Sequence, residues 1–143
     1  MAHPSQRKRH RAALQNLQGG DYNVTVGAYS LQNAKYALSN VIIGNSAAIN
    51  STSNIRSVVI GTSTASNANL TESIVIGTNT ATNVNTSASV IIGYKSAKNL
   101  VNGNSNILIG NGADVFKPNT INAISISSCN TLTANNSISI GTN

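Results

Sequence analysis

A short pattern of apolar positions recurs along the chain. Each copy has two Val or Ile residues separated by one residue and followed by Gly, with Ser127 in the Gly position of one copy. The eight copies lie at 24–27, 41–44, 58–61, 74–77, 90–93, 107–110, 124–127 and 138–141. Successive Gly positions are 17, 17, 16, 16, 17, 17 and 14 residues apart. Apolar residues at i and i+2 share one face of a strand, and Gly permits the positive φ of a turn. The pattern predicts a strand and a turn in every copy.

Aligning the copies on this Gly shows further columns. The residue four before it is Asn or Ser in seven of eight copies, with Ala123 the exception. Four residues after it, Ala48, Ala65, Ala81 and Ala97 align, and we expect them on the narrow inward side of a second, shorter strand. The predicted turn and amide-ladder positions, where Asn stacks from coil to coil and tolerates a left-handed backbone, are Gly44, Gly61, Gly77, Gly93, Gly110, Asn33, Asn50, Asn67, Asn83 and Asn99.

One such unit is too small to bury its own apolar face, so neighbouring units must stack. The predicted fold is an all-β parallel β-solenoid, or β-roll, of about 7–8 coils with 16–17-residue repeats, spanning residues 21–143. At about 4.8 Å per coil it extends roughly 34 Å. Aromatic residues are 3% of the chain, which is consistent with a coil interior too thin for rings.

The middle residue of the strand is also apolar in five copies. We expect the flanking Val and Ile residues to line the interior, among them Ile43, Ile60, Ile76, Ile92 and Ile109. The middle residues, expected on the outer face, are Ile42, Val59, Val75, Ile91 and Leu108. A strand that is apolar on both faces is buried on both, so a second chain is expected to cover the outer face. Ser125 and Ser139 take the middle position in the last two copies, where we expect the packing to change.

The segments Ser-Val-Val-Ile-Gly-Thr (57–62), Ser-Ile-Val-Ile-Gly-Thr (73–78) and Ser-Val-Ile-Ile-Gly-Tyr (89–94) resemble the head repeats of trimeric autotransporter adhesins, the YadA-like β-roll. The resemblance covers roughly residues 23–143 and implies a homotrimer whose chains lie side by side, as a rigid spacer or adhesive head. Similar repeats also occur in fibre and surface proteins of large DNA viruses and phages. Most repeats here are longer than is usual in that family.

Residues 1–20 differ from the rest of the chain. They hold a basic cluster, whereas the remainder is nearly neutral although the whole chain has a net charge of +6. Ala12, Ala13, Leu14 and Leu17 have near-helical spacing, so we expect part of this segment to be helical. It could be a solvated tail, a nucleic-acid-binding tail or a peptide that docks on a partner protein. We favour docking, through Arg7, Lys8, Arg9, Arg11, Leu14 and Leu17; nucleic acid is disfavoured because the body is a poor electrostatic surface for phosphates.

Residues for catalysis are scarce. The carboxylates are Asp21, Glu72 and Asp114, both His residues lie in the first ten residues, and no Cys/His spacing suits a metal. We therefore expect no enzyme activity, no cofactor, no metal and no membrane insertion. Ice binding is disfavoured, because Thr-x-Thr units occur in register on only two coils, at 62–64 and 78–80.

These observations favour a non-enzymatic virion structural protein, a homotrimeric capsid-decoration, fibre or spike component. We expect it to assemble in the host cytoplasm, since residues 1–20 contain no apolar stretch typical of a secretory signal. Its expected partners are copies of itself, capsid or other virion proteins bound through residues 1–20, and a host surface receptor. The alternative is the head of a bacterial trimeric autotransporter adhesin at the cell surface. The loop 111–119, with Asp114, Phe116 and Pro118, is a candidate contact site.

Overall fold

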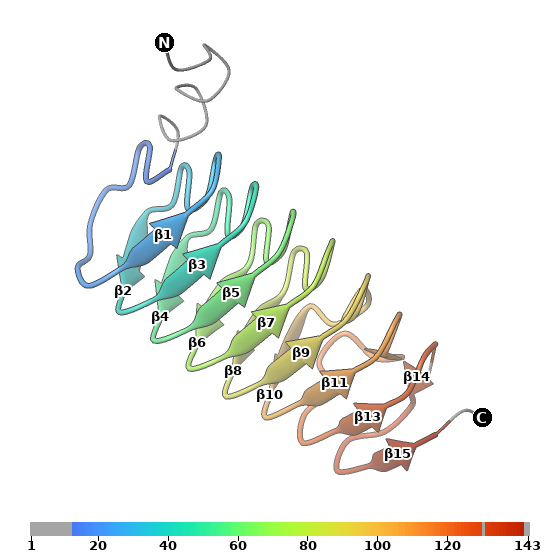
Figure 1. The fold of residues 1–143 in the computed structure, drawn as a ribbon. Coiled ribbons are helices and arrows are strands. Elements are labelled where there is room, and N and C mark those ends of the chain that lie inside the picture. The colour runs from blue at the N-terminus through green and yellow to red at the C-terminus, as the bar shows by residue number, and fades with distance from the viewer. Residues whose placement is uncertain (1–12, 130, 142–143) are drawn as a thin grey trace, which may run out of the picture.

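The computed structural model describes residues 13–129 and 131–141. They wind into an all-β parallel solenoid of about 7 turns with repeats of about 17 residues, as the sequence predicts (Figure 1). Each turn contributes one strand to a larger sheet, and most also contribute one to a smaller sheet behind it.

The larger sheet contains the strands of the recurring apolar pattern. Neighbouring strands in this sheet are parallel and pair in strict register, so that Val41 lies beside Val58 and Val58 beside Ile74. In spatial order the eight strands are β1 (Val24–Val26), β3 (Val41–Ile43), β5 (Val58–Ile60), β7 (Ile74–Ile76), β9 (Val90–Ile92), β11 (Ile107–Ile109), β13 (Ile124–Ile126) and β15 (Ile138–Ile140).

The smaller sheet is formed by the second strand of each regular coil and ends before the last coils. Its five strands are β2 (Tyr36–Leu38), β4 (Ser53–Ile55), β6 (Asn69–Thr71), β8 (Asn85–Ser87) and β10 (Asn102–Asn104). Beyond β10 the chain makes a separate pair, β12 (Asp114–Val115) with β14 (Thr131–Leu132). The regular coil therefore changes towards the C-terminal end.

The core lies between the two sheets and takes one side chain from the middle of each strand. In the larger sheet, the fully buried middle residues are Ile42, Val59, Val75, Ile91, Leu108 and Ser125. In the smaller sheet, Ala37, Asn54 and Leu70 are fully buried, and Thr86 is nearly so. Small and β-branched residues suit this narrow interior, because only one side chain per strand has to fit.

The prediction of which side chains in the larger sheet face the core is wrong. The middle residues point inward, and the flanking residues, including Ile43 and Ile60, lie on the outer face. Side chains two residues apart on a strand point to the same side. The Asn or Ser four residues before the Gly is two residues from the middle residue, so both point inward. In the five central coils these polar residues are buried and accept hydrogen bonds from the next coil, as Asn40 does from the Ser57 amide at 2.9 Å. The inward row is thus part polar, and the more apolar row faces outward.

The turn that leaves each larger-sheet strand depends on Gly. Gly44 has φ of 137°, and a Cβ there would overlap the Gly61 carbonyl of the next coil. The same applies from Gly61 to Gly110, so the predicted turn role is confirmed. The Ala column is buried as expected, but Ala48 and its equivalents lie in this turn at positive φ and not in a second strand. Burial of these side chains against the core offsets the modest cost of a left-handed backbone, and Leu31 takes the same position in the first coil, also buried and at positive φ.

The described part of the N-terminal segment is not helical. Residues 13–16 form turns, Leu14 and Asn16 have positive φ, and Gly19 makes a parallel bridge with Tyr36. The Leu14 amide donates to the Ser30 carbonyl at 3.0 Å, in the manner of one coil stacked on the next. The helical prediction is therefore wrong for residues 13–18, which form the edge of the solenoid, with Leu17 packed against the core.

Candidate interaction surfaces

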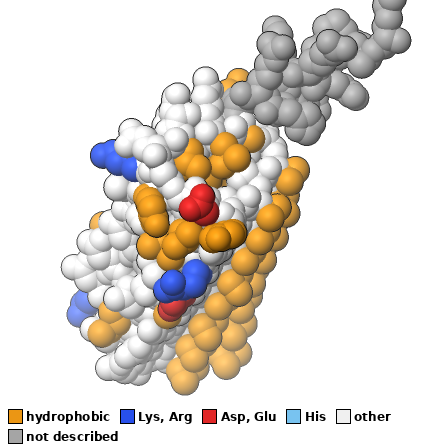
Figure 2. Space-filling model, turned by 90° about the vertical axis from the view of Figure 1, so that its left-hand side faces the viewer, with side chains coloured by type: hydrophobic (Ala, Val, Ile, Leu, Met, Phe, Trp, Pro, Cys, Tyr) orange, Lys and Arg blue, Asp and Glu red, His pale blue; other side chains and the backbone are white. Residues whose placement is uncertain are grey.

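The outer face of the larger sheet is a continuous apolar surface. Two columns of Val and Ile cross all eight strands, and Figure 2 shows them as a strip along one side of the molecule. Even on an inner strand, Val41 and Ile43 are each 37% exposed, and Ile140 at the last strand is 73% exposed. The outer members of the columns are Val24, Val26, Val41, Ile43, Val58, Ile60, Ile74, Ile76, Val90, Ile92, Ile107, Ile109, Ile124, Ile126, Ile138 and Ile140.

This face carries no charge. None of the strands β1, β3, β5, β7, β9, β11, β13 and β15 contains a charged residue. Because the strands are in register, like side chains lie behind one another at the spacing of the coils. A contiguous exposed apolar surface of this kind is a candidate interaction site.

The outer face of the smaller sheet is mostly polar. Asn69, Asn85 and Asn102 form an amide ladder, with Nδ2 of Asn69 donating to Oδ1 of Asn85 at 2.8 Å and Nδ2 of Asn85 to Oδ1 of Asn102 at 2.9 Å. The repeat alignment did not single out this ladder, because Ser53 and Tyr36 take the same position on the earlier strands. The outer face of the larger sheet is therefore apolar, and that of the smaller sheet is mostly polar.

The predicted Asn column forms a second ladder along the turns. Asn33 donates to Asn50 at 2.9 Å and Asn67 to Asn83 at 3.0 Å, and all four have positive φ. Asn99 departs from this, since its backbone amide donates to the Asp114 carboxylate at 3.0 Å. The ladder prediction is thus confirmed for these two pairs.

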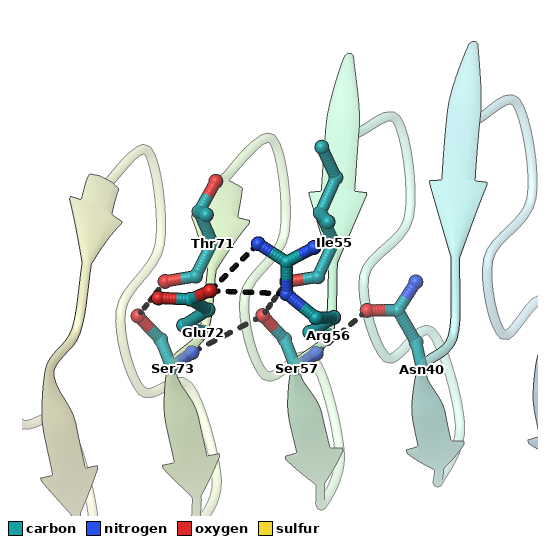
Figure 3. Close-up of polar contacts among 7 residues, drawn as sticks. All are labelled: Asn40, Ile55, Arg56, Ser57, Thr71, Glu72 and Ser73. Carbon is teal, nitrogen blue, oxygen red and sulfur yellow. Dashed lines mark hydrogen bonds and ion pairs between the residues drawn. The ribbon is translucent and has the colours of Figure 1, made fainter.

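The Asn and Ser residues four before the Gly form a polar column that is buried in the central coils. In the first six copies, the side-chain oxygen of the residue four before the Gly accepts from the backbone amide of the next coil; these residues are Asn23, Asn40, Ser57, Ser73, Ser89 and Asn106. Oγ of Ser57 accepts from the Ser73 amide at 3.3 Å (Figure 3). Further along the column, Oγ of Ser73 accepts from the Ser89 amide at 3.3 Å and Oγ of Ser89 from the Asn106 amide at 3.0 Å. This column satisfies amides where the chain turns the corner between the sheets. On the solvent side of the same corner, Arg56 and Glu72 form an ion pair at 2.6 Å (Figure 3).

Asp114 is the one buried carboxylate within residues 13–129 and 131–141. Burial raises the pKa of this carboxyl above its ordinary value, while hydrogen bonds from the amides of Val115, Asn99 and Lys98 and the Lys98 charge oppose the rise. It lies where the smaller sheet ends and organises the irregular coil there. Phe116 and Pro118, also proposed as contact residues, are exposed.

The predicted docking residues are only partly within the described chain. Arg7, Lys8, Arg9 and Arg11 lie outside the described residues. Leu14 is 41% exposed, whereas Leu17 packs against the core. Leu17 therefore has a structural role at the edge of the solenoid, and Leu14 is accessible.

Over the same described residues, no three His, Cys, Asp or Glu side chains gather where they could hold a metal ion. That part of the chain also contains no helix long and apolar enough to cross a bilayer.

No protein-family model matches the chain, and neither the curated proteins nor the solved structures include a match. The function must therefore be argued from the surfaces themselves.

Proposed function

We propose that this chain is a non-enzymatic structural protein that works as a homotrimer, with the outer faces of three larger sheets packed around a shared axis. The observation that carries the proposal is the uncharged double column of Val and Ile. Covering it removes a large apolar area from water, at about 25 cal/mol per Å².

A second copy of the chain is the partner that suits this face best. The face is ridged at the coil spacing of about 4.8 Å, and another copy presents the same ridges at the same spacing. Side chains of two such faces can interdigitate at every coil, as they do between packed sheets. The number three comes from the resemblance to the YadA-like head repeats.

The biological setting we propose is a virion, as a capsid-decoration, fibre or spike component. It is supported by the occurrence of similar repeats in viral and phage fibre and surface proteins. Residues 1–20, with their basic cluster, would dock on a capsid or other virion protein. A rigid module with a self-associating face and a separate docking segment suits such a role.

The head of a bacterial adhesin is the second candidate, favoured by the segments 57–62, 73–78 and 89–94. Deleting residues 1–12 distinguishes the two. A virion component would remain trimeric but no longer bind its capsid, whereas an adhesin head would keep its attachment to host surfaces.

Self-association is tested with two matched double variants. Ile60→Lys with Ile76→Lys places charges on adjacent strands of the apolar face, and Thr71→Lys with Ser87→Lys does so at the third position of adjacent strands in the smaller sheet. Sedimentation of the unmodified protein should give about three times the chain mass of 14.7 kDa. The first variant should sediment as a folded monomer, and the second should remain trimeric. A monomeric unmodified protein, or equal loss in both variants, would disprove the proposal.

A further inference from the structure

A groove lies on the outer face of the smaller sheet, at its C-terminal end. Its volume is about 520 Å³. Strands β6, β8 and β10 supply the floor, and Asn119 and Ile121 supply the wall. The lining residues on the floor are Asn69, Thr71, Asn85, Thr86, Asn102, Gly103 and Asn104.

The wall exists because the regular coil is interrupted. The amides of Val101 and Asn102 both donate to the Pro118 carbonyl, at 2.8 and 3.0 Å, so the segment after Phe116 lies beside β10 without forming the next strand. The flat sheet face thus meets an irregular segment. Earlier strands of the smaller sheet have no such neighbour, which explains why the groove is at this end.

The groove holds hydrogen-bonding groups that the fold does not use. Asn102 accepts from Asn85, but its Nδ2 has no partner within the described residues. Asn104 accepts from the Ser87 amide at 3.2 Å, and its Nδ2 is likewise free there. The Asn119 side chain makes no hydrogen bond to any described residue. Each of these amides can still donate two hydrogen bonds, and Asn119 can also accept two.

The lining points to one chemical class of ligand. It contains no charged residue and only one large apolar side chain, Ile121, so it offers no recognition for an ion or for an apolar peptide side chain. Amides donate and accept in the same small space, which matches the paired hydroxyl groups of a sugar. Amide groups of the ladder recur along the solenoid axis, so successive polar groups of a chain-like ligand find equivalent partners.

We propose that this groove binds a neutral oligosaccharide, with Asn102, Asn104 and Asn119 as the hydrogen-bonding residues. The site goes beyond the structural role proposed above. It lies on the sheet opposite the apolar face, so self-association through that face leaves it accessible (Figure 1). No aromatic ring lines the groove for stacking on a sugar face, so a single site should bind weakly, with a Kd of about 1 mM.

The test is a titration of the full chain with three neutral sugars, maltohexaose, cellohexaose and hexa-N-acetylchitohexaose, each to 10-fold above the expected Kd of about 1 mM. Side-chain amide NMR signals of Asn102, Asn104 and Asn119 report binding directly. At least one neutral hexasaccharide should shift these signals while those of Asn33 and Asn50 stay in place. No shift with any of the three sugars would overturn the proposal, as would shifts located elsewhere on the solenoid.

Variants show whether these residues bind the sugar. Asn102→Ala with Asn119→Ala should raise the Kd by about tenfold, since two hydrogen bonds are lost. Asn50→Ala is the matched control, because Asn50 is likewise an exposed ladder residue that accepts from its neighbour. It should leave the Kd unchanged. Equal affinity in the groove variant and the control would overturn the proposal. Sedimentation of the same samples tests self-association separately, so the two proposals can fail independently.

Discussion

The two sheets of the solenoid share an inner design and differ completely outside. In both, the middle residue of each strand faces the core, as Ile91 and Leu70 do. Outside, the larger sheet presents two columns of Val and Ile, whereas most of the smaller presents Asn, Ser and Thr. The inner row of middle residues is therefore common to both sheets, and the outer rows are where they differ. The outer rows are where we place the two proposed roles, self-association on the larger sheet and a polar ligand on the smaller.

The strongest test of this comparison is truncation in the two inner rows. Ile91→Ala and Leu70→Ala each remove a fully buried aliphatic side chain from the same interior. Each should reduce the free energy of unfolding by about 2–5 kcal/mol, and by similar amounts. Urea denaturation followed by circular dichroism measures both. A small effect for Leu70→Ala alone would mean that the smaller sheet does not help to hold the core.

A second test compares the buried polar column with the exposed amide ladder. Ser73→Ala removes the acceptor of the Ser89 amide, which is buried, and should cost about 1–3 kcal/mol. Asn85→Ala breaks exposed ladder contacts on a strand residue that has no positive φ, and should cost less, because water replaces the lost partners. Denaturation midpoints of the two variants give the order, and the reverse order would show that the outer ladder stabilises the coil more than the inner column does.

The sequence was sufficient to predict the architecture because the repeat restricts it so strongly. The period, the parallel stacking, the Gly turns and two pairs of the Asn ladder follow from columns such as Gly44 and Asn50. The strand faces could not be assigned by apolar content alone. The face with two Val or Ile residues is the more apolar one, which predicts a core. The buried Asn40 and Ser57, however, lie two residues before the middle residue and point to the same side as it does.

The groove was beyond prediction for a different reason. It depends on where the smaller sheet stops and on the path of residues 118–121, which follow no repeat. The exposed Asn69–Asn85–Asn102 ladder is equally hidden in the sequence, because Asn is common throughout the chain. Irregular coils carry little pattern, and a site formed by one is therefore visible only in the structure.

A third test concerns the end of the smaller sheet, where Asp114 is buried. Its pKa is raised in the folded chain by burial, so the folded state favours the neutral carboxyl. The resulting stability is fully present below the ordinary pKa of 3.8 and is lost as the pH rises through the raised pKa. Asp114→Asn should therefore unfold at higher temperature than the unmodified protein at neutral pH, and the difference should shrink below pH 3.8. A variant that is less stable at neutral pH would show that the carboxylate hydrogen bonds dominate.

The smallest effect is expected at the corner between the sheets, on the solvent side. Arg56 and Glu72 form an ion pair at 2.6 Å, but their side chains are 58% and 53% exposed, so water and salt screen the attraction. Ala88 takes the same corner position with φ of 51°, close to the 50° of Arg56, so the backbone there accepts Ala. Arg56→Ala should therefore lower the free energy of unfolding by less than about 1 kcal/mol, and the loss should fall further in 1 M salt. Thermal unfolding at low and high salt measures it. A large, salt-independent loss would mean that the corner, and not only the inner rows, holds the two sheets together.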